Sequence, residues 1–424
     1  MARVGEVFVP GGLPSITYNP REELKLEQRV RDYLDQRHRV LSLSGPTKSG
    51  KTVLLRTVVA ESISISGGSI SSVNEFWEAV VDHTGGYTEI GIEASDTESA
   101  GSVTGGGVSG GMPGLAQAEG QHSRSRDEAQ TTSDTRSRRR PPHIVAAEGL
   151  KRVGLPLIID DFHYMNPDIQ VAVIRGLKEL VFDGAPVILA SVPHRAFDAV
   201  RVEREMTGRV EQLEIRFWSP EELRGIAETG FEALNVTVAE AIVKRLIEES
   251  FSSPHLMQDF CLALCIVNDV RETESETREL QAPNWIEFFQ ERASSASKTA
   301  FELLAQGPRQ RADRIERVLK DGTTTDIYGA VLAGIAATGP VTALDYTDLR
   351  SSLREIMADP PQTQEVTRVL EIMSNIARDK IEGEPVVDYD QERSALFISD
   401  PFFAYYLRWG TDPPLAAVRE TLRP

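Results

Sequence analysis

The sequence predicts an α/β fold in which a parallel sheet, sandwiched by helices, is followed by an all-α segment and a small domain of helices and strands. Two observations predict this fold. A glycine-rich loop near residue 45 stands between an apolar run and a helical segment, and further apolar runs at residues 155–161 and 186–191 are separated by helical patterns. Strands that alternate with helices form a parallel sheet covered on both faces. Beyond residue 219 the pattern is helical.

The glycine-rich loop is a complete G-x-x-x-x-G-K-T motif. The apolar run Val40–Leu43 before it is typical of a buried strand, and residues 53–60 after it have a helical pattern. This order lets backbone N–H groups and the positive end of the helix face phosphates. We therefore expect a P-loop that binds ATP through Gly45, Pro46, Thr47, Lys48, Ser49, Gly50, Lys51 and Thr52. Lys51 is expected to reach the β and γ oxygens, and the Thr52 hydroxyl to ligate Mg²⁺.

Two carboxylates follow the next buried strand, residues 155–159. An aspartate at the carboxyl end of a strand lies on the sheet edge where ligands gather, so Asp160 is predicted to help hold Mg²⁺. Asp161 is predicted to polarise the attacking water. The alternative interpretation is that the two acids only cap a turn before Phe162.

Three further residues are considered for roles at this site. Ser191 ends the following strand, where a hydroxyl can sense the γ-phosphate; the alternative is an ordinary turn serine. Arg209 precedes a third strand, residues 210–217, and is a candidate for reaching a neighbouring subunit's γ-phosphate, with Arg204 as a competitor and a solvated arginine as the alternative. His163 is interpreted as a packed polar residue.

A long segment interrupts the predicted α/β domain. Residues 85–142 are rich in Gly, Ser, Thr, Ala and Glu and end in a basic run. Such a composition buries too little apolar surface to offset backbone entropy of about 1–2 kcal/mol per residue, so we expect a disordered insertion. The basic run is interpreted as solvated, with contact to nucleic acid as the alternative.

The remaining pattern divides the chain into domains. Ser219 and Glu222, with proline between them, predict a capped helix start. Helices are expected at 169–182, 196–206, 326–338, 346–357 and 364–377, and paired strands at 385–389 and 394–398. The last three helices and the two strands follow one another in the order of a winged-helix domain. The predicted map is 1–84 and 143–218 for the nucleotide-binding core, 85–142 for the insertion, 219–295 for a helical lid and 296–424 for the winged-helix domain.

Composition limits the cellular setting. The net charge of −18 argues against general attraction to nucleic acid or anionic lipid. The chain contains no run of about 18 apolar residues and no basic stretch followed by an apolar core at its start, so we expect a cytoplasmic protein that does not enter membranes. Cys261 and Cys265 lie four apart without a second pair, and we interpret them as core residues; a redox pair is the alternative.

These motifs together resemble the AAA+ superfamily, in particular its STAND and origin-recognition-like branches, which have a helical lid and a winged helix. Gly45–Thr52 is similar to Walker A, and Leu157–His163 to a Walker B in which two acids and a downstream histidine recur. Ser191 falls at sensor 1, and Ser253–Met257 at the G-x-P-x-L turn of the lid. The resemblance covers about residues 15–270.

The chain also departs from the family pattern. Ser253 replaces the lid glycine, and His255 stands where related ATPases place the sensor 2 arginine, so His255 is a candidate nucleotide-binding residue. A histidine is only partly charged near neutral pH, which implies weaker or pH-sensitive lid closure and slow turnover. The insertion at 85–142 is outside the family core. Residues 398–406 are similar to the last segment of prokaryotic STAND-like ATPases.

The favoured function is an ATP-dependent switch that hydrolyses slowly and biases the winged helix between docked and released arrangements. The chain contains no effector motif, so output is expected through a separate partner protein or a homo-oligomer formed when ATP binds. The resemblance implies bacterial signalling or antiphage defence. A DNA-binding initiator-like or transposition-helper ATPase is the alternative, disfavoured because residues 301–424 carry a net charge of about −6. A scaffold that never hydrolyses is a third hypothesis, which Asp161 opposes.

Overall fold

The computed structural model describes the chain in several stretches, namely residues 1–94, 134–192, 208–293, 295–308, 315–339, 341–381, 385–412 and 415. The predicted helix at 196–206, with Arg204, lies outside these residues, as does most of the predicted insertion. Among the described helices, none is long and apolar enough to cross a membrane.

A five-stranded parallel sheet forms the first domain. Its strands are β1 (Val40–Ser44), β2 (Ile63–Ser66), β5 (Leu157–Asp160), β6 (Val187–Ser191) and β7 (Val210–Glu214), in the order β2-β5-β6-β1-β7. Strand β6 lies between the strand that leads into the glycine-rich loop and the strand that ends in Asp160. The carboxyl ends of these strands therefore bring the predicted motifs to one edge of the sheet.

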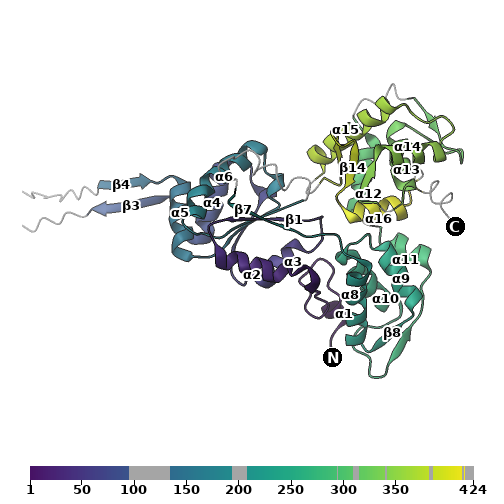
Figure 1. Ribbon diagram of the computed structural model, residues 1–424, viewed down its shortest axis with the longest axis horizontal. Coiled ribbons are helices and arrows are strands. Elements are labelled where there is room, and N and C mark those ends of the chain that lie inside the picture. Colours follow the sequence, from purple (N-terminus) through teal and green to yellow (C-terminus); the bar gives the residue numbers. More distant parts are fainter. Residues whose placement is uncertain are drawn as a thin grey trace, which may run out of the picture.

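Helices cover both faces of this sheet (Figure 1). Helices α2 (Leu26–Gln36) and α3 (Lys51–Val58) pack on one face, and α4 (Val73–Thr84), α5 (Pro142–Val153) and α6 (Pro167–Phe182) pack on the other. Successive strand residues alternate between the two cores, since Ile159 belongs to one and Ile158 to the other. The predicted α/β sandwich is confirmed.

The flanks of the predicted disordered insertion are ordered. Strands β3 (Glu89–Ala94) and β4 (Asp134–Arg139) pair antiparallel, and Figure 1 shows this ribbon projecting away from the sheet domain. Two strands thus occur within the segment 85–142, and disorder of the remainder, which lies mostly outside the described residues, stays a prediction. In residues 89–94 the apolar alternation consists of only Ile90 and Ile92, which is too short to predict a strand from the sequence.

The lid follows the sheet domain. It contains α8 (Pro220–Ala233), α9 (Glu240–Glu249), α10 (Pro254–Val267), α11 (Trp285–Glu291) and the parallel pair β8 (Val236–Val238) and β9 (Arg278–Leu280). The capping box at Ser219 and Glu222 forms as predicted. A short N-terminal helix, α1 (Val4–Val7), packs in the lid core, although the predicted map assigned residues 1–84 to the sheet domain.

The C-terminal domain has the topology of a winged helix. Its elements are α12 (Ser295–Gln306), β10 (Arg317–Val318), β11 (Thr324–Thr325), α13 (Ile327–Ala337), β12 (Ala343–Asp345), α14 (Tyr346–Ile356), α15 (Thr363–Lys380), β13 (Val387–Asp390), β14 (Ala395–Ile398) and α16 (Pro401–Trp409). The sheet order β12-β14-β13 places the first strand beside the last. Helix α16 lies on the side that faces the lid (Figure 1).

Lid and C-terminal domain share one hydrophobic core, whereas the sheet domain has two cores of its own. The Tyr405 hydroxyl on α16 donates to the Phe289 carbonyl on α11, at 2.5 Å. Glu249 on α9 is fully buried and accepts from Arg408 at 2.8 Å and from the Trp409 indole at 2.8 Å. The described structure is therefore built from two bodies, the sheet domain and a combined lid and C-terminal domain.

Candidate nucleotide-binding site

The glycine-rich loop curls at the carboxyl end of β1. Gly50 has φ of +98° and directly precedes α3, a conformation that favours glycine. A side chain at Gly45 would put its Cβ 2.9 Å from the Cβ of Ile215, the residue after β7, so these two segments approach closely only because residue 45 is glycine. The N-terminus of α3 therefore opens directly onto the loop.

Polar groups inside the loop suit a phosphate ligand. Lys51 is 7 % exposed, and its Nζ donates to the Gly45 carbonyl at 2.8 Å and the Pro46 carbonyl at 2.9 Å. Two buried hydroxyl oxygens, Thr47 Oγ1 and Ser49 Oγ, have no hydrogen-bond partner among the described residues. Buried polar atoms normally have partners, so these oxygens are positioned for a polar ligand. The loop therefore fits a phosphate.

The structure brings Thr52 and Asp160 into direct contact. Thr52 Oγ1 donates to Asp160 Oδ2 at 2.8 Å, and the backbone N–H of Asp161 donates to Asp160 Oδ1 at 3.0 Å. A hydroxyl and a carboxylate are oxygen ligands of the kind Mg²⁺ prefers, with phosphates and water completing its shell. No cluster of three or more His, Cys, Asp or Glu that could hold a metal occurs in the described parts of the chain. These two residues therefore fit a Mg²⁺ ion shared with a nucleotide.

Asp161 occupies a strained and electrostatically unfavourable position. Its φ is +52°, and its carboxyl has a raised pKa, first because of burial and then because of the Asp160 charge, with Lys51 opposing. A carboxylate with a raised pKa is a stronger base. Asp161 thus has the properties expected of a residue that polarises water.

Ser191 lies between the two predicted motifs. Its carbonyl accepts from the Gly45 N–H at 3.1 Å, and in the strand register it is paired with Ser44 at the end of β1. The serine is buried at the carboxyl end of β6, beside the phosphate loop. Ser191 is not among the residues that line the cavity around Lys51, Thr52, Asp160 and Asp161, and its contact with a γ-phosphate stays a prediction.

Arg209 is not brought to this site. It precedes β7, and its carbonyl accepts from the N–H of Val40 at the beginning of β1, so it lies at the opposite end of the strands from the phosphate loop. Its guanidinium lies over the exposed Phe182 ring at 5.5 Å. Arg209 therefore lies too far from the phosphate loop of its own chain, and its predicted contact with a γ-phosphate requires a neighbouring subunit.

A cavity of about 600 Å³ connects the loop, Asp160 and Asp161 with the lid. Its lid wall includes His255 and Gln258, and another wall is the N-terminal segment 9–21. The apolar lining beyond the phosphate loop includes Val9, Pro14, Leu26 and Ile226. Ligand pockets commonly combine an apolar wall with a few polar groups, and this wall suits a nucleobase.

Segment 9–21 is the part of the site that sequence reasoning missed. Residues 9–21 show neither helical nor strand periodicity, so nothing in this stretch predicts a place beside the nucleotide. The Tyr18 hydroxyl donates to Glu27 at 2.9 Å, and burial followed by this bond raises its pKa to about 12. The segment is thereby fixed beside the cavity.

His255 lines the cavity without a positive charge. Burial, and next the Lys48 ammonium, lower its pKa to about 4, with Asp400 opposing. Its ring meets the Phe402 ring edge-on at 4.8 Å. His255 therefore changes its charge at acid pH and not near neutral pH. At neutral pH it does not supply the positive charge that an arginine would bring to this wall of the cavity.

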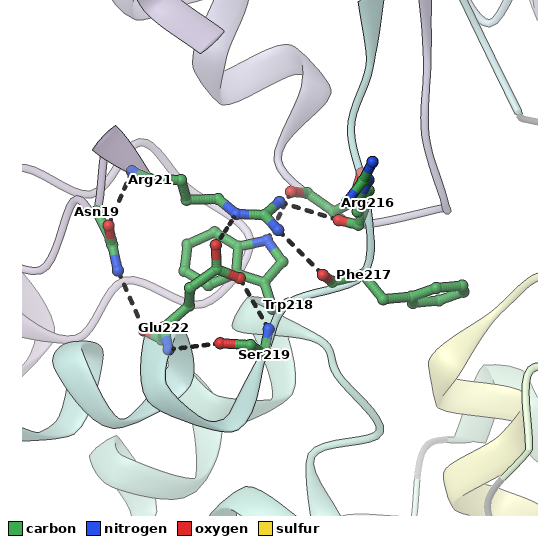
Figure 2. A network of polar contacts seen from close by, with 8 residues as sticks. Asn19, Arg21, Arg216, Phe217, Trp218, Ser219 and Glu222 are labelled. Atoms are coloured by element: carbon green, nitrogen blue, oxygen red, sulfur yellow. Dashed lines mark hydrogen bonds and ion pairs between the residues drawn. The ribbon is translucent and has the colours of Figure 1, made fainter. Parts of the chain in front are cut away.

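Arg21 ties the cavity wall to residues 215–219, the linker, or hinge, between the sheet domain and the lid (Figure 2). Its side chain, in a residue 6 % exposed, donates to Glu222 at 2.7 Å and to the carbonyls of Arg216 and Phe217 at 2.9 and 3.0 Å. It lies over the Trp218 indole, whose N–H donates to the Ser49 carbonyl at 2.9 Å. The hinge is thus hydrogen-bonded directly to the phosphate loop, which the sequence did not reveal.

Comparison with known proteins adds evidence on the fold. No protein-family model matches the chain, and no curated protein sequence matches it. Among solved structures, the chain is similar to the Walker-type ATPase PABY2304 of Pyrococcus abyssi, with 12 % identity, 91 % of this chain and 95 % of that chain covered, and a TM-score of 0.51. Other matches are Cdc6p from Pyrobaculum aerophilum (14 % identity, 100 % of both chains, TM-score 0.41) and the ORC2 protein of Aeropyrum pernix (13 %, 98 % and 96 %, TM-score 0.47).

Proposed function

We propose that this chain, which has the fold of the origin-recognition-like AAA+ P-loop ATPases, is a molecular switch of the STAND type that binds ATP with Mg²⁺ and hydrolyses it slowly. One observation carries the proposal. Lys51, Thr52, Asp160 and Asp161 border one cavity whose opposite wall belongs to the lid. A ligand there contacts both bodies of the structure and can bias their arrangement.

Each polar residue has a role in this proposal. The Lys51 ammonium binds the β and γ phosphates, Thr52 and Asp160 hold Mg²⁺, and Asp161 polarises the attacking water. The metal supplies charge neutralisation at the phosphates. Ser191 contacts the γ-phosphate from the end of β6.

Hydrolysis is expected to be slow, on the order of one turnover per minute or less. His255 has a pKa of about 4 and brings no charge to the γ-phosphate at neutral pH. Arg209, the other candidate, reaches a phosphate only across an interface between subunits. Assembly of an ATP-bound homo-oligomer would then both accelerate hydrolysis and present a new surface to a partner protein. A role in bacterial signalling or antiphage defence rests on the resemblance alone.

DNA binding is the second candidate, because a winged helix often places its third helix in the major groove. That helix is α15. Its charged residues are balanced, with Arg368, Arg378 and Lys380 against Glu365, Glu371 and Asp379. Arg378 is paired with Asp388 at 3.1 Å, and Glu365 with Arg317 at 3.0 Å. Phosphate contacts need a basic face, so the switch is favoured.

The test combines two titrations at about 150 mM salt, where non-specific DNA binding is weakened. Calorimetry of wild-type protein with ATP and Mg²⁺ is expected to give saturable binding, and light scattering of the ATP-bound Asp161→Asn protein an increase in mass. Fluorescence anisotropy with labelled duplex DNA is expected to show no binding. Tight, salt-dependent DNA binding by a protein that stays monomeric would replace the switch with the initiator-like function.

A further inference from the structure

The phosphate loop contains a second lysine in an unusual backbone conformation. Lys48 has φ of +57°, and within the loop only Gly50 shares a positive φ. Glycine adopts this conformation without strain, whereas a lysine does so at an energetic cost. Strained residues cluster at ligand sites, so the contacts of the Lys48 side chain are of interest at this position.

The Lys48 side chain reaches the C-terminal domain. Its Nζ lies 3.3 Å from Asp400 Oδ1 and 3.8 Å from the centre of the Phe402 ring. Asp400 is the N-cap of α16, and its Oδ1 also accepts from the Phe402 N–H at 2.9 Å. Phe402 in turn touches His255 of the lid, at 4.8 Å between ring centres. One lysine of the phosphate loop thus contacts the beginning of α16.

Helix α16 cannot respond to this contact alone. Buried bonds from Tyr405 and Trp409 fix it to the lid, and the lid and C-terminal domain share a core. The Lys48 contact therefore connects the sheet domain to the second body of the structure, which is the combined lid and C-terminal domain. The hinge residue Trp218 is bonded to the same loop, through its indole N–H and the Ser49 carbonyl.

We propose that Asp400 and the nucleotide's phosphates compete for Lys48. Lys48 is one of the residues that line the cavity, while its ammonium lies against Asp400 and Phe402, so a bound phosphate is within reach of a change in its side-chain conformation. A triphosphate carries more negative charge than one carboxylate, and an ammonium that turns to it releases Asp400. The lid and C-terminal domain then rotate together about the hinge. This regulation rests on the proposed ATP binding, and it assigns the release of the second body to one ion pair.

Two substitutions remove the pair without disturbing local folding. Lys48→Gly relieves the backbone strain, and Asp400→Asn keeps a good N-cap. Matched controls exist for both. Lys25→Gly removes another exposed lysine with positive φ, 49°, and Asp345→Asn changes an N-cap aspartate of α14 that makes no side-chain cap bond.

The position of the second body is measured by energy transfer between dyes on Asp82→Cys and Arg350→Cys, two exposed helix positions in α4 and α14. Native Cys261 and Cys265 are buried and do not compete for labelling. Without nucleotide, Lys48→Gly and Asp400→Asn are expected to shift the signal toward that of ATP-bound wild type, changing the ratio of the two arrangements about fivefold. The two controls are expected to match wild type, and the double variant to add nothing to either single variant.

Affinity supplies a second readout. Because Asp400 competes with phosphate, Asp400→Asn is expected to bind ATP about fivefold more tightly in calorimetry, by reciprocity with the shift above. Wild-type energy transfer and affinity in both variants would overturn the proposal. If wild type fails to bind ATP, the proposed function fails and the competition fails with it, whereas normal ATP binding by wild type with unchanged energy transfer in the variants overturns the competition alone.

Discussion

Replacing Lys51 by alanine is expected to weaken ATP binding by about 10- to 150-fold. The ammonium is buried and held over the loop by two carbonyls, so it is already positioned for a phosphate oxygen. One hydrogen bond between charged groups contributes about 1.5–3 kcal/mol, which corresponds to this range. Isothermal titration calorimetry with ATP and Mg²⁺ measures the change.

Two controls separate lost phosphate contact from a damaged loop. Adenosine has no phosphate, so its affinity for Lys51→Ala is expected to equal that for wild type. Lys244→Ala removes an exposed lysine of α9, whose side chain is 70 % exposed, and is expected to bind ATP normally. Unchanged ATP affinity in Lys51→Ala, or an equal loss for adenosine, refutes the role assigned to Lys51.

Three other residues give direct tests. Asp161→Asn is expected to bind ATP like wild type and to hydrolyse it several-fold more slowly in a phosphate-release assay, because its carboxylate no longer polarises water; a wild-type rate would make it a turn residue. Folding lowers the pKa of His255 from 6.5 to about 4, so as pH falls this side chain is protonated in the unfolded chain before it is protonated in the folded protein. Protonation therefore favours the unfolded chain, and the folded protein loses stability as pH falls from about 6.5 toward 4. Between pH 7.5 and pH 5 wild type is therefore expected to lose more thermal stability than His255→Gln, and equal losses contradict the assignment. Glu249→Gln removes the buried carboxylate that pairs with the partly exposed Arg245 and Arg408, and it is expected to cost about 1–3 kcal/mol in denaturant unfolding, whereas Glu248→Gln, at an exposed position, is expected to cost little.

The motifs of the sheet domain could be predicted because their signals are local in sequence. A strand, loop and helix in one short stretch identified Gly45–Thr52, and an apolar strand ending in two acids identified Asp160 and Asp161. The parallel topology then requires the ends of β1, β5 and β6 to meet at one edge. The Thr52–Asp160 bond, between residues 108 apart, follows from this topology.

The other walls of the site could not be predicted, because no local pattern marks them. Segment 9–21 has neither helical nor strand periodicity, and its place beside the cavity depends on Arg21 bonding to the first turn of α8. The pairing of Lys48 with Asp400 joins residues 352 apart in different domains. Helix α5 was also missed, since it directly follows the segment interpreted as disordered. Long-range contacts of this kind are fixed by packing and not by periodicity.

The shared core of lid and C-terminal domain changes the expected mode of switching. The sequence suggested a winged helix that docks and releases by itself. Release of that kind would expose Tyr405, Trp409 and the fully buried Glu249, with a large loss of apolar burial and of the bonds that Glu249 accepts from Arg408 and Trp409. Among the residues that the structure describes, the second body contacts the phosphate loop through a partly exposed ion pair and a ring contact at Lys48 and through one indole hydrogen bond at Trp218. Such contacts are worth about 1 kcal/mol each, within reach of a ligand's differential affinity, so the movable boundary is the one that runs through the nucleotide cavity.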